Sequence, residues 1–457
     1  MERILYGPLD GSSLSGFWAL PFLGIILSIA IFPLVAPSLW SKHYGKISSV
    51  WALIIIVGIG ISKGLGVTLH NLTQVMFEQF LPFIFLLLAL FTITGGIKIR
   101  GSIKGTPKFN TLMLAVGAIL ASWLGTTGAA VLFIRPLLKA NEHRHNKVHT
   151  ILFFIFIVGN IGGSLTPIGN PPLLMGYISH IPFFWTVTHL FAPTLLTTGI
   201  MLVVYYLLDL YFFKKQKSHM HEVDYSRLGI DGALNLLLLI FAIAAVVISS
   251  NDFGIAFTLF EVEVNWSEVL ELVALGFLTW ASIKVTAKDI RKYNNFTWHP
   301  IIEVGKIFTC IFIAMSPLVA ILRAGESGAM ASLIHSLTDA AGNPANGVYY
   351  WASGMLSAFL DSAPAYLVFF NIAAAPADAA GMMPHVYMVE HVPATLLAIT
   401  MGASFMGALS YIGNAPNMMI KAIAEENGVK MPSFFGYMLW SFGILVPLFL
   451  LMQWLFL

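Results

Sequence analysis

Long apolar stretches separated by short polar segments run through the chain from residue 16 to its last residue. A helix needs about 20 mainly apolar residues to cross the hydrocarbon core of a bilayer. On this rule we expect ten spans, near residues 16–37, 49–69, 78–97, 150–180, 185–213, 231–250, 265–284, 300–322, 389–424 and 434–456. Two further apolar stretches, 109–138 and 345–375, need a separate explanation. The pattern predicts an all-α polytopic membrane protein.

Composition supports this class. Hydrophobic residues make up 58% of the 457 residues and charged residues 10%, whereas soluble domains carry about 25% charged residues. The net charge of +2 comes from basic residues in short loops between apolar spans. Such a distribution excludes a nucleic-acid-binding surface and leaves the lipid bilayer as the expected partner.

Basic residues also predict the orientation, because short cytoplasmic loops of membrane proteins are rich in Lys and Arg. Six segments hold 19 of the 24 basic residues: 41–46, 98–108, 139–147, 214–227, 284–292 and 421–430. We expect all six to be cytoplasmic loops. Both chain termini are then outside.

The two unexplained stretches fit re-entrant hairpins. Both loops that flank residues 109–138 are basic, so this stretch enters and leaves by the cytoplasmic face, with its tip at residues 125–128. The segments that flank 345–375 lack Lys and Arg, so this stretch enters from outside, with its tip at residues 361–364. Irregular backbone at membrane depth occurs only where protein or a water-filled cavity surrounds it. The two hairpins therefore point at one central site.

A 13-residue motif occurs twice and breaks two of the predicted spans. GSLTPIGNPPLLM (163–175) and GALSYIGNAPNMM (407–419) are identical at seven positions. Secondary transporters built from inverted repeats place matching broken helices on both sides of a pseudo-twofold axis at the bilayer midplane. We expect two inverted repeats of five spans and one re-entrant hairpin each. Their expected bounds are 1–213 (hairpin 109–138, broken helix 150–180), a cytoplasmic linker 214–230, and 231–457 (hairpin 345–375, broken helix 389–424).

Asp361 is the strongest candidate for chemistry, because it is the one acidic residue at a hairpin tip. A carboxylate at membrane depth is costly unless it has a partner, and a cation or a proton is the expected partner. A structural ion pair is the alternative interpretation. Uncharged side chains at the tips and breaks offer further oxygen ligands, although each alone is typical of helix packing or capping: Thr126, Thr127, Ser164, Thr166, Asn170, Ser362, Ser410, Asn414 and Asn417.

Other polar residues have simpler explanations. Glu303 and Lys306 are three residues apart at the end of a span, which predicts an ion pair on one helix face. His143, His145 and His149 fall in or beside a basic loop and are expected to be solvated. We find no convergent nucleophile, base or metal-ligand set, so the sequence does not indicate an enzyme, and no cofactor is expected. A channel is disfavoured by the inverted repeat.

The paired hairpins and the two IGN-containing breaks resemble the ion transporter superfamily, in particular the NhaD-type sodium/proton antiporters and the citrate-transporter-like family. SAFLDSAPAYLVFF (357–370) resembles their ion-site segment, which implies that Asp361 is the ion-binding carboxylate. TPIGNPP and YIGNAPN resemble their broken-helix signatures. The resemblance implies binding roles at both motifs, for Thr166, Gly169 and Asn170 and for the matching Gly413, Asn414 and Asn417.

Substrate remains open between two classes. A carboxylate repels an anion and attracts a cation, so Asp361 favours sodium (or lithium)/proton antiport as the first choice, with sodium as the transported ligand held by Asp361, Asn170 and Asn414. Transport of citrate or another organic anion, coupled to sodium, protons or metal, is the alternative, because a metal-bound anion tolerates the carboxylate. The resemblance further implies an elevator mechanism, a homodimer and the bacterial cytoplasmic membrane.

Overall fold

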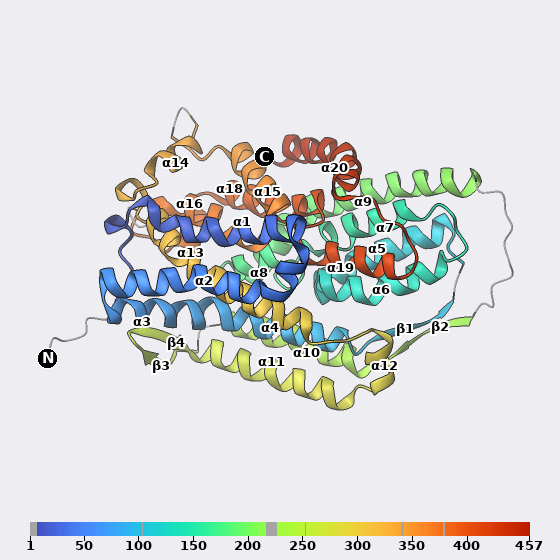
Figure 1. The fold of residues 1–457 in the computed structure, drawn as a ribbon. Helices are drawn as coiled ribbons and strands as arrows, with labels where there is room; N and C mark the ends of the chain where they lie inside the picture. The colour runs from blue at the N-terminus through green and yellow to red at the C-terminus, as the bar shows by residue number, and fades with distance from the viewer. Residues whose placement is uncertain (1–6, 103, 216–225, 252, 340–341, 378–379) are drawn as a thin grey trace.

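A computed structural model describes residues 7–102, 104–215, 226–251, 253–339, 342–377 and 380–457. The helices run mostly along one axis, which lies horizontally in Figure 1. The chain is mostly helical and forms an all-α polytopic membrane protein. Among the described residues, seven helices are long and apolar enough to cross a bilayer, and a bent pair at residues 384–409 makes up to eight.

The first half of the chain begins with two short turns, η1 (Gly11–Ser13) and η2 (Gly16–Ala19). Three spans follow: α1 (Leu20–Val35), α2 (Pro37–Lys63), and α3 (Leu65–Gln74) continued by the π-helix η3 (Val75–Phe80) and α4 (Leu81–Thr94). Next come α5 (Pro107–Leu124), α6 (Thr126–Ala140), α7 (Val148–Ile157), η4 (Ile161–Gly163), α8 (Pro171–Ile178) and α9 (Phe183–Lys215).

The second half repeats this order. Its first helices are α10 (Leu234–Ser249), α11 (Trp266–Val285) and, after the short α12 (Lys288–Tyr293), α13 (His299–Arg323). A short region of η5 (Gly325–Ser327) and α14 (Ala331–Ser336) leads into the rest: α15 (Asn346–Phe359), α16 (Ser362–Ala373), η6 (Ala375–Ala377), α17 (Pro384–Glu390), α18 (Pro393–Phe405), η7 (Met406–Leu409), α19 (Ala415–Glu426) and α20 (Phe434–Phe456).

Two pairs of helices form tight hairpins. Hairpin 1 consists of α5 and α6, which pack side by side and are joined by Gly125 alone. Hairpin 2 consists of α15 and α16, which are joined by Leu360 and Asp361. The two hairpins extend from opposite ends of the molecule toward its centre (Figure 1). The structure thus turns the chain at the tips that the sequence indicates.

Short strands join segments at the two ends of the molecule. β1 (Lys98–Ser102) pairs antiparallel with β2 (Ser226–Asp231), which brings two of the basic segments together. β3 (Ile255–Leu259) and β4 (Val262–Asn265) form a hairpin at the other end. Most of the expected linker, 214–230, lies outside the described residues, although its first two residues end α9 and its last five belong to β2.

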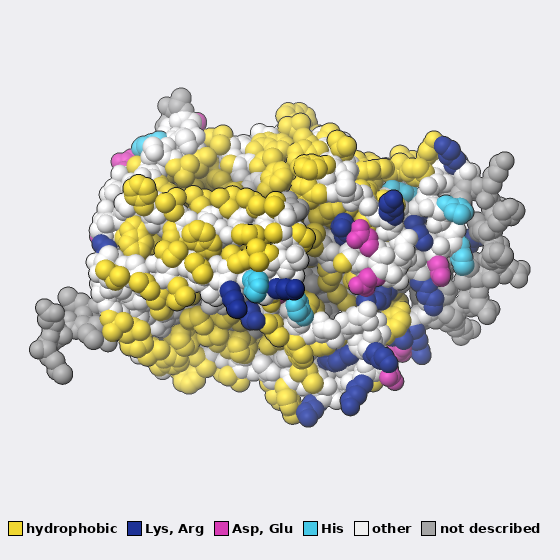
Figure 2. All heavy atoms as spheres, in the orientation of Figure 1, with side chains coloured by type: hydrophobic (Ala, Val, Ile, Leu, Met, Phe, Trp, Pro, Cys, Tyr) yellow, Lys and Arg dark blue, Asp and Glu magenta, His cyan; other side chains and the backbone are white. Residues whose placement is uncertain are grey.

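Basic side chains gather toward one end of the molecule, on the right in Figure 2, while hydrophobic side chains cover much of the remaining surface in this view. Exposed Leu, Ile, Val, Phe and Trp side chains on α1, α2, α9, α10, α11 and α20 form this apolar surface. Lipid is the environment that such a surface requires. The sidedness of the basic end remains a prediction.

Some expected boundaries are wrong. Residues 41–46, expected as a loop, lie inside α2, which begins at Pro37 and ends before Gly64 instead of covering 49–69. The Pro at the first helical position and the positive φ of Gly64 (89°) set these ends. The broken helix expected from residue 389 begins at Pro393, because a bend of 100° separates α17 from α18. The polar residues 41–46 suggested a loop because they interrupt the apolar pattern near the start of α2.

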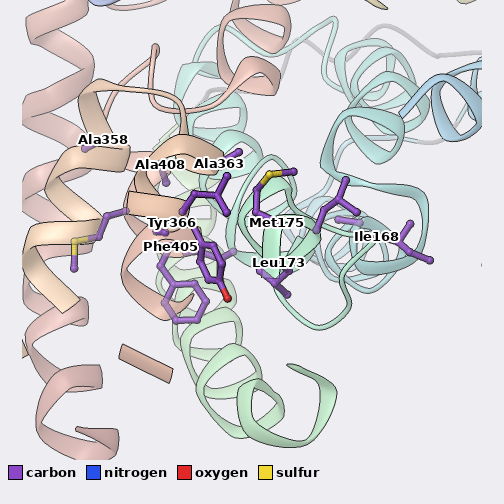
Figure 3. Close-up of a cluster of buried hydrophobic side chains, with 14 of the residues drawn as sticks. Ile168, Leu173, Met175, Ala358, Ala363, Tyr366, Phe405 and Ala408 are labelled. Atoms are coloured by element: carbon purple, nitrogen blue, oxygen red, sulfur yellow. The ribbon is translucent and has the colours of Figure 1, made fainter. Parts of the chain in front are cut away.

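The two repeats pack into each other at the centre. α16 of hairpin 2 packs against α8, and α6 of hairpin 1 packs against α19. Figure 3 shows Leu173 and Met175 of α8 near Tyr366 of α16. A Cβ on Gly176 would lie 2.6 Å from the Tyr366 hydroxyl, so any larger residue there would displace the tyrosine side chain.

Candidate functional site

The tip of hairpin 1 is attached to the first break. Gly125 has a φ of 75°, a conformation that favours glycine, and the chain enters α6 immediately afterwards. The backbone N–H of Thr126 donates to the carbonyl of Gly169 at 2.9 Å. One tip residue and one motif residue are therefore held together by main-chain atoms.

The tip of hairpin 2 carries the carboxylate. Asp361 is the N-cap residue of α16, and its Oδ1 accepts a hydrogen bond from the N–H of Ala363 at 3.1 Å. Asp is among the preferred residues at this position because its side chain satisfies a free N–H of the first turn. The side chain is half-buried, so one part of the carboxylate stays accessible while the other stabilises the helix start.

Hydroxyls of the two motifs bind the hairpins in matching ways. Thr166 Oγ1 donates to the carbonyl of Ser122 in hairpin 1, and Ser410 Oγ donates to the carbonyl of Ala358 in hairpin 2. Both side chains are fully buried. These two hydrogen bonds hold each motif against its hairpin.

The IGN glycines permit close backbone approach. A Cβ on Gly169 would lie 2.1 Å from the carbonyl oxygen of Gly163, and a Cβ on Gly413 would lie 2.5 Å from that of Gly407. No side chain fits at such distances. Each break is therefore a compact loop whose two ends touch through glycine.

Asparagines connect the two breaks to each other. Asn170 Nδ2 donates to Ser404 O at 3.4 Å, and Asn414 Nδ2 donates to Gly159 O and Asn160 Oδ1 at 3.2 Å each. Asn160 Nδ2 donates in turn to Asn417 Oδ1 at 2.8 Å. The breaks thus meet through amide side chains at the centre of the molecule.

The sequence did not single out Asn160, which is fully buried. When the two 13-residue motifs are superimposed, Asn160 matches Ser404 and its partner Asn417 matches Leu173. The two asparagines are therefore paired departures from the repeat. Such a paired exchange is the signal that could have identified Asn160.

A cavity of about 480 Å³ lies between the tips, the breaks and the helices α1, α2, α4 and α13. Six of the twelve candidate residues line it: Thr126, Thr127, Gly169, Asn170, Asp361 and Asn414. The other six lie behind this wall: Ser164, Thr166, Ser362, Ser410, Gly413 and Asn417. Of these twelve, the buried hydroxyls of Ser164 and Ser362 and the Oδ1 of Asn170 have no hydrogen-bond partner among the described residues.

A comparison of the sequence with family profiles identifies the family. The profile of the family described as "Putative citrate transport" matches residues 11–457. The chain belongs to this family. It is accordingly a secondary transporter and an integral, multi-pass membrane protein. No curated protein matches the chain. The resemblance to citrate-transporter-like proteins is confirmed, whereas a specific likeness to NhaD-type antiporters is not.

In this member of the citrate transport family, four helices begin at the cavity. These are α6, α8, α16 and α19, whose first residues or N-caps are among the lining residues. The N-terminus of a helix carries free N–H groups and a partial positive charge. Asp361 caps α16, whereas α6, α8 and α19 have no side-chain cap among the described residues.

Full charges in the lining are few. Among the described lining residues, Asp361 and Glu303 are the charged ones, and Lys and Arg are absent. Glu303 does not form the expected pair with Lys306. Its Oε2 lies 3.6 Å from Nδ1 of His299, while the Lys306 ammonium lies 5.9 Å from the centre of the Tyr44 ring. Glu303 thus contacts His299, four residues earlier, and not Lys306, three residues later. Its side chain lines the cavity.

Proposed function

We propose that the protein carries citrate or a related polycarboxylate together with a cation, and that both bind in the central cavity. The observation that carries this proposal is the meeting of three uncapped helix N-termini and one carboxylate, Asp361, around a single cavity. The family match supports an organic anion as the substrate class. Antiport of sodium and protons becomes the second candidate.

The helix N-termini account for the anion. The partial positive charge of a helix start favours a bound anion by about 0.3–1 kcal/mol, or up to about 2 kcal/mol when partly buried. Free N–H groups can bind its oxygens directly at α6 and α19, whereas α8 begins with Pro171 and Pro172, which have no N–H, and contributes its charge alone. The hydroxyls of Thr126 and Thr127 and the amide of Asn414 add neutral donors beside these N-termini. Several weak donors suit a ligand with several carboxylates.

A cation is needed because the cavity wall is acidic. At an effective dielectric constant of 20, two like charges about 5 Å apart repel by about 3 kcal/mol. Without a Lys or Arg in the described lining, a cation is the group that can offset this repulsion. Asp361 and the free Oδ1 of Asn170 supply oxygen ligands for it, and hard cations such as sodium or magnesium prefer oxygen.

Sodium/proton antiport is favoured by Asp361 on its own. One carboxylate that binds either a proton or a cation lowers the apparent affinity for one ion when the other is bound. This competition produces exchange when the empty, charged site crosses the membrane poorly. The same residue thus serves both candidate functions, and the presence or absence of an organic anion separates them.

We also propose elevator-type movement in a homodimer. The hairpins and breaks pack on one another across the repeats, which favours their moving as one unit, here called the moving unit (hairpins 1 and 2, α7, α8, α18 and α19). The cavity is lined by Pro33, Trp40 and Pro300, which lie at helix ends close in sequence to the basic segments 41–46 and 284–292. With the predicted sidedness, the site is then open to the cytoplasm.

The test uses purified protein in proteoliposomes. Uptake of labelled citrate is measured with sodium, magnesium or neither, and proton movement is recorded after addition of sodium, lithium or citrate. We expect citrate uptake that requires a cation and is lost in Asp361→Asn, in which the amide still caps α16. Proton release on sodium addition without citrate would instead support antiport. Cation-independent citrate uptake would contradict both candidates.

A further inference from the structure

A second carboxylate is buried away from the central cavity, on α11. Glu271 is 8% exposed, although its helix displays Trp266, Leu270, Val273 and Phe277 on the outer surface. It accepts a hydrogen bond from Ser249 Oγ at the end of α10. A buried carboxylate is costly unless hydrogen bonds or a charge partner compensate for the loss of water. The proposed transport mechanism does not use it.

Ser249 connects this carboxylate to the moving unit. Its Oγ lies 3.0 Å from the hydroxyl of Tyr177, which also donates to Val246 O at 2.7 Å. Tyr177 belongs to α8, and the N-terminus of α8 lines the central cavity. Glu271 and the α8 half-helix are therefore joined by a chain of two hydroxyls across the boundary between the moving unit and the remaining spans.

The contacts in this chain require more protons than the two hydroxyls supply. Ser249 Oγ is close to three oxygens: Glu271 Oε2, Val246 O at 2.9 Å and Tyr177 OH at 3.0 Å. The Tyr177 proton is used on Val246 O, which leaves the single Ser249 proton for three contacts. The Ser250 hydroxyl, 3.4 Å from Tyr177, is too far to contribute a good bond.

A proton on Glu271 reduces this deficit from two hydrogens to one. The carboxylic acid then donates to Ser249 Oγ, and the Ser249 proton becomes free for Tyr177 or Val246. An ionised Glu271 would leave two pairs of oxygens facing each other at 3.0 Å or less without a hydrogen between them. Buried oxygens that face each other without a hydrogen between them destabilise the contact, because neither group regains the hydrogen bond it made to water.

From this geometry we propose that Glu271 is a proton-binding site that holds α8 against the fixed spans in the conformation described here. Loss of the proton weakens the Tyr177–Ser249 attachment and releases α8, which favours movement of the central site. The movement itself rests on the proposed elevator function. Proton occupancy at Glu271 would then control the conformational equilibrium without touching the substrate.

The elements around Glu271 carry few other ionisable side chains. Glu268, one turn earlier on α11, accepts a hydrogen bond from the N–H of Asn265 at 3.1 Å and caps the start of the helix. Of the elements packed against α11, α4 and α10 carry no ionisable side chain, and β3 and β4 carry Glu263, which is exposed. Asp252, which follows α10, lies outside the described residues. Tyr177 is the remaining titratable neighbour.

The test measures the conformational equilibrium directly, without substrate. Spin labels are placed on exposed residues at the basic end, at Ser38→Cys of α2 and Lys430→Cys after α19, in a Cys310→Ser background. Distances between the labels are measured in liposomes from pH 5.5 to 8.5. We expect one distance at low pH and a second population, grown at least fivefold, at high pH.

Variants assign the response to Glu271. Glu271→Gln keeps a donor toward Ser249 and should show the low-pH distance at every pH, whereas Tyr177→Phe should show the second population at every pH. Glu268→Gln, which can keep the helix cap, is the matched control and should respond as the unmodified protein does. A pH response that persists in Glu271→Gln, or disappears in Glu268→Gln, would overturn the proposal. A single distance that does not change with pH in the labelled Cys310→Ser protein would also overturn it. Measurement of flux in proteoliposomes decides separately whether the proposed transport function is correct.

Discussion

The hydrogen bond between Asn160 and Asn417 is expected to stabilise the contact between the two breaks. Asn417 is fully buried, accepts from Asn160 Nδ2 at 2.8 Å, and donates to Gly407 O and Ser410 O at 2.9 Å each. The matching residue of the first repeat is Leu173, so the repeat itself provides the substitution, Asn417→Leu. Leucine has similar size but makes none of the three bonds.

The expected cost follows from these three bonds. Each buried group left without a partner costs about 1–3 kcal/mol, and burial of a leucine side chain returns about 1.5–3 kcal/mol. We therefore expect Asn417→Leu to lower the free energy of unfolding by about 4 kcal/mol. The reverse exchange, Asn160→Ser, introduces the residue found at Ser404 and should cost about 3 kcal/mol, because Asn417, Asn414 and Ile155 each lose a bond.

The double variant distinguishes a direct bond from two separate effects. With leucine at position 417, the bond that Asn160→Ser removes no longer exists, so the two costs should sum to about 1–3 kcal/mol more than the double variant loses. Unfolding by SDS in mixed micelles, followed by circular dichroism, provides the comparison. Costs that add within about 0.5 kcal/mol would refute a direct Asn160–Asn417 interaction.

Three further predictions concern the fold around the site. Gly169→Ala should abolish transport and lower thermal stability, because its Cβ would lie 2.1 Å from a carbonyl oxygen, whereas Gly199→Ala meets nothing within 4 Å and should change neither; equal melting temperatures would contradict the close approach. Asp209→Asn should lower the free energy of unfolding by about 3–5 kcal/mol, since it leaves the buried charge of Arg144 without its counter-charge; an unchanged unfolding midpoint in SDS would refute this. Cysteines in both loops that flank hairpin 1 should react with an impermeant maleimide from the cytoplasmic face only, and labelling from opposite faces would make α5 a full span.

The sequence was informative where a special backbone was needed. Gly125, Asp361 and the IGN glycines occur where the chain turns or approaches itself closely, and such positions restrict the residue type strongly. The all-α membrane fold followed from long apolar runs, because lipid leaves no other use for them. The turns, the close approaches and the apolar helices depend on residues that are near one another in the sequence, so a single sequence is enough to predict them.

Side-chain direction inside the breaks was not predictable. The hydroxyls of Thr166 and Ser410 donate to hairpin carbonyls. Their direction could not be read from the sequence, because a broken helix has no 3.6-residue period, and their role as ligands stays a prediction. His149 was expected to be solvated, yet it is 3% exposed and lies 2.7 Å from Asp209. This contact joins residues 60 positions apart, and only the folded chain brings them together.

Departures from the repeat indicate where the two halves of the site differ. When the hairpins are superimposed on the motif contacts, Gly125 of one tip matches Asp361 of the other. On the proposed function, a cation at the centre meets one acidic tip and one neutral tip, so its favoured position is nearer hairpin 2. The uncapped start of α6 at hairpin 1 then favours the anion carried with it. The proposal therefore assigns different ions to the two hairpins because their tips differ, although the order of helices in the two halves is the same.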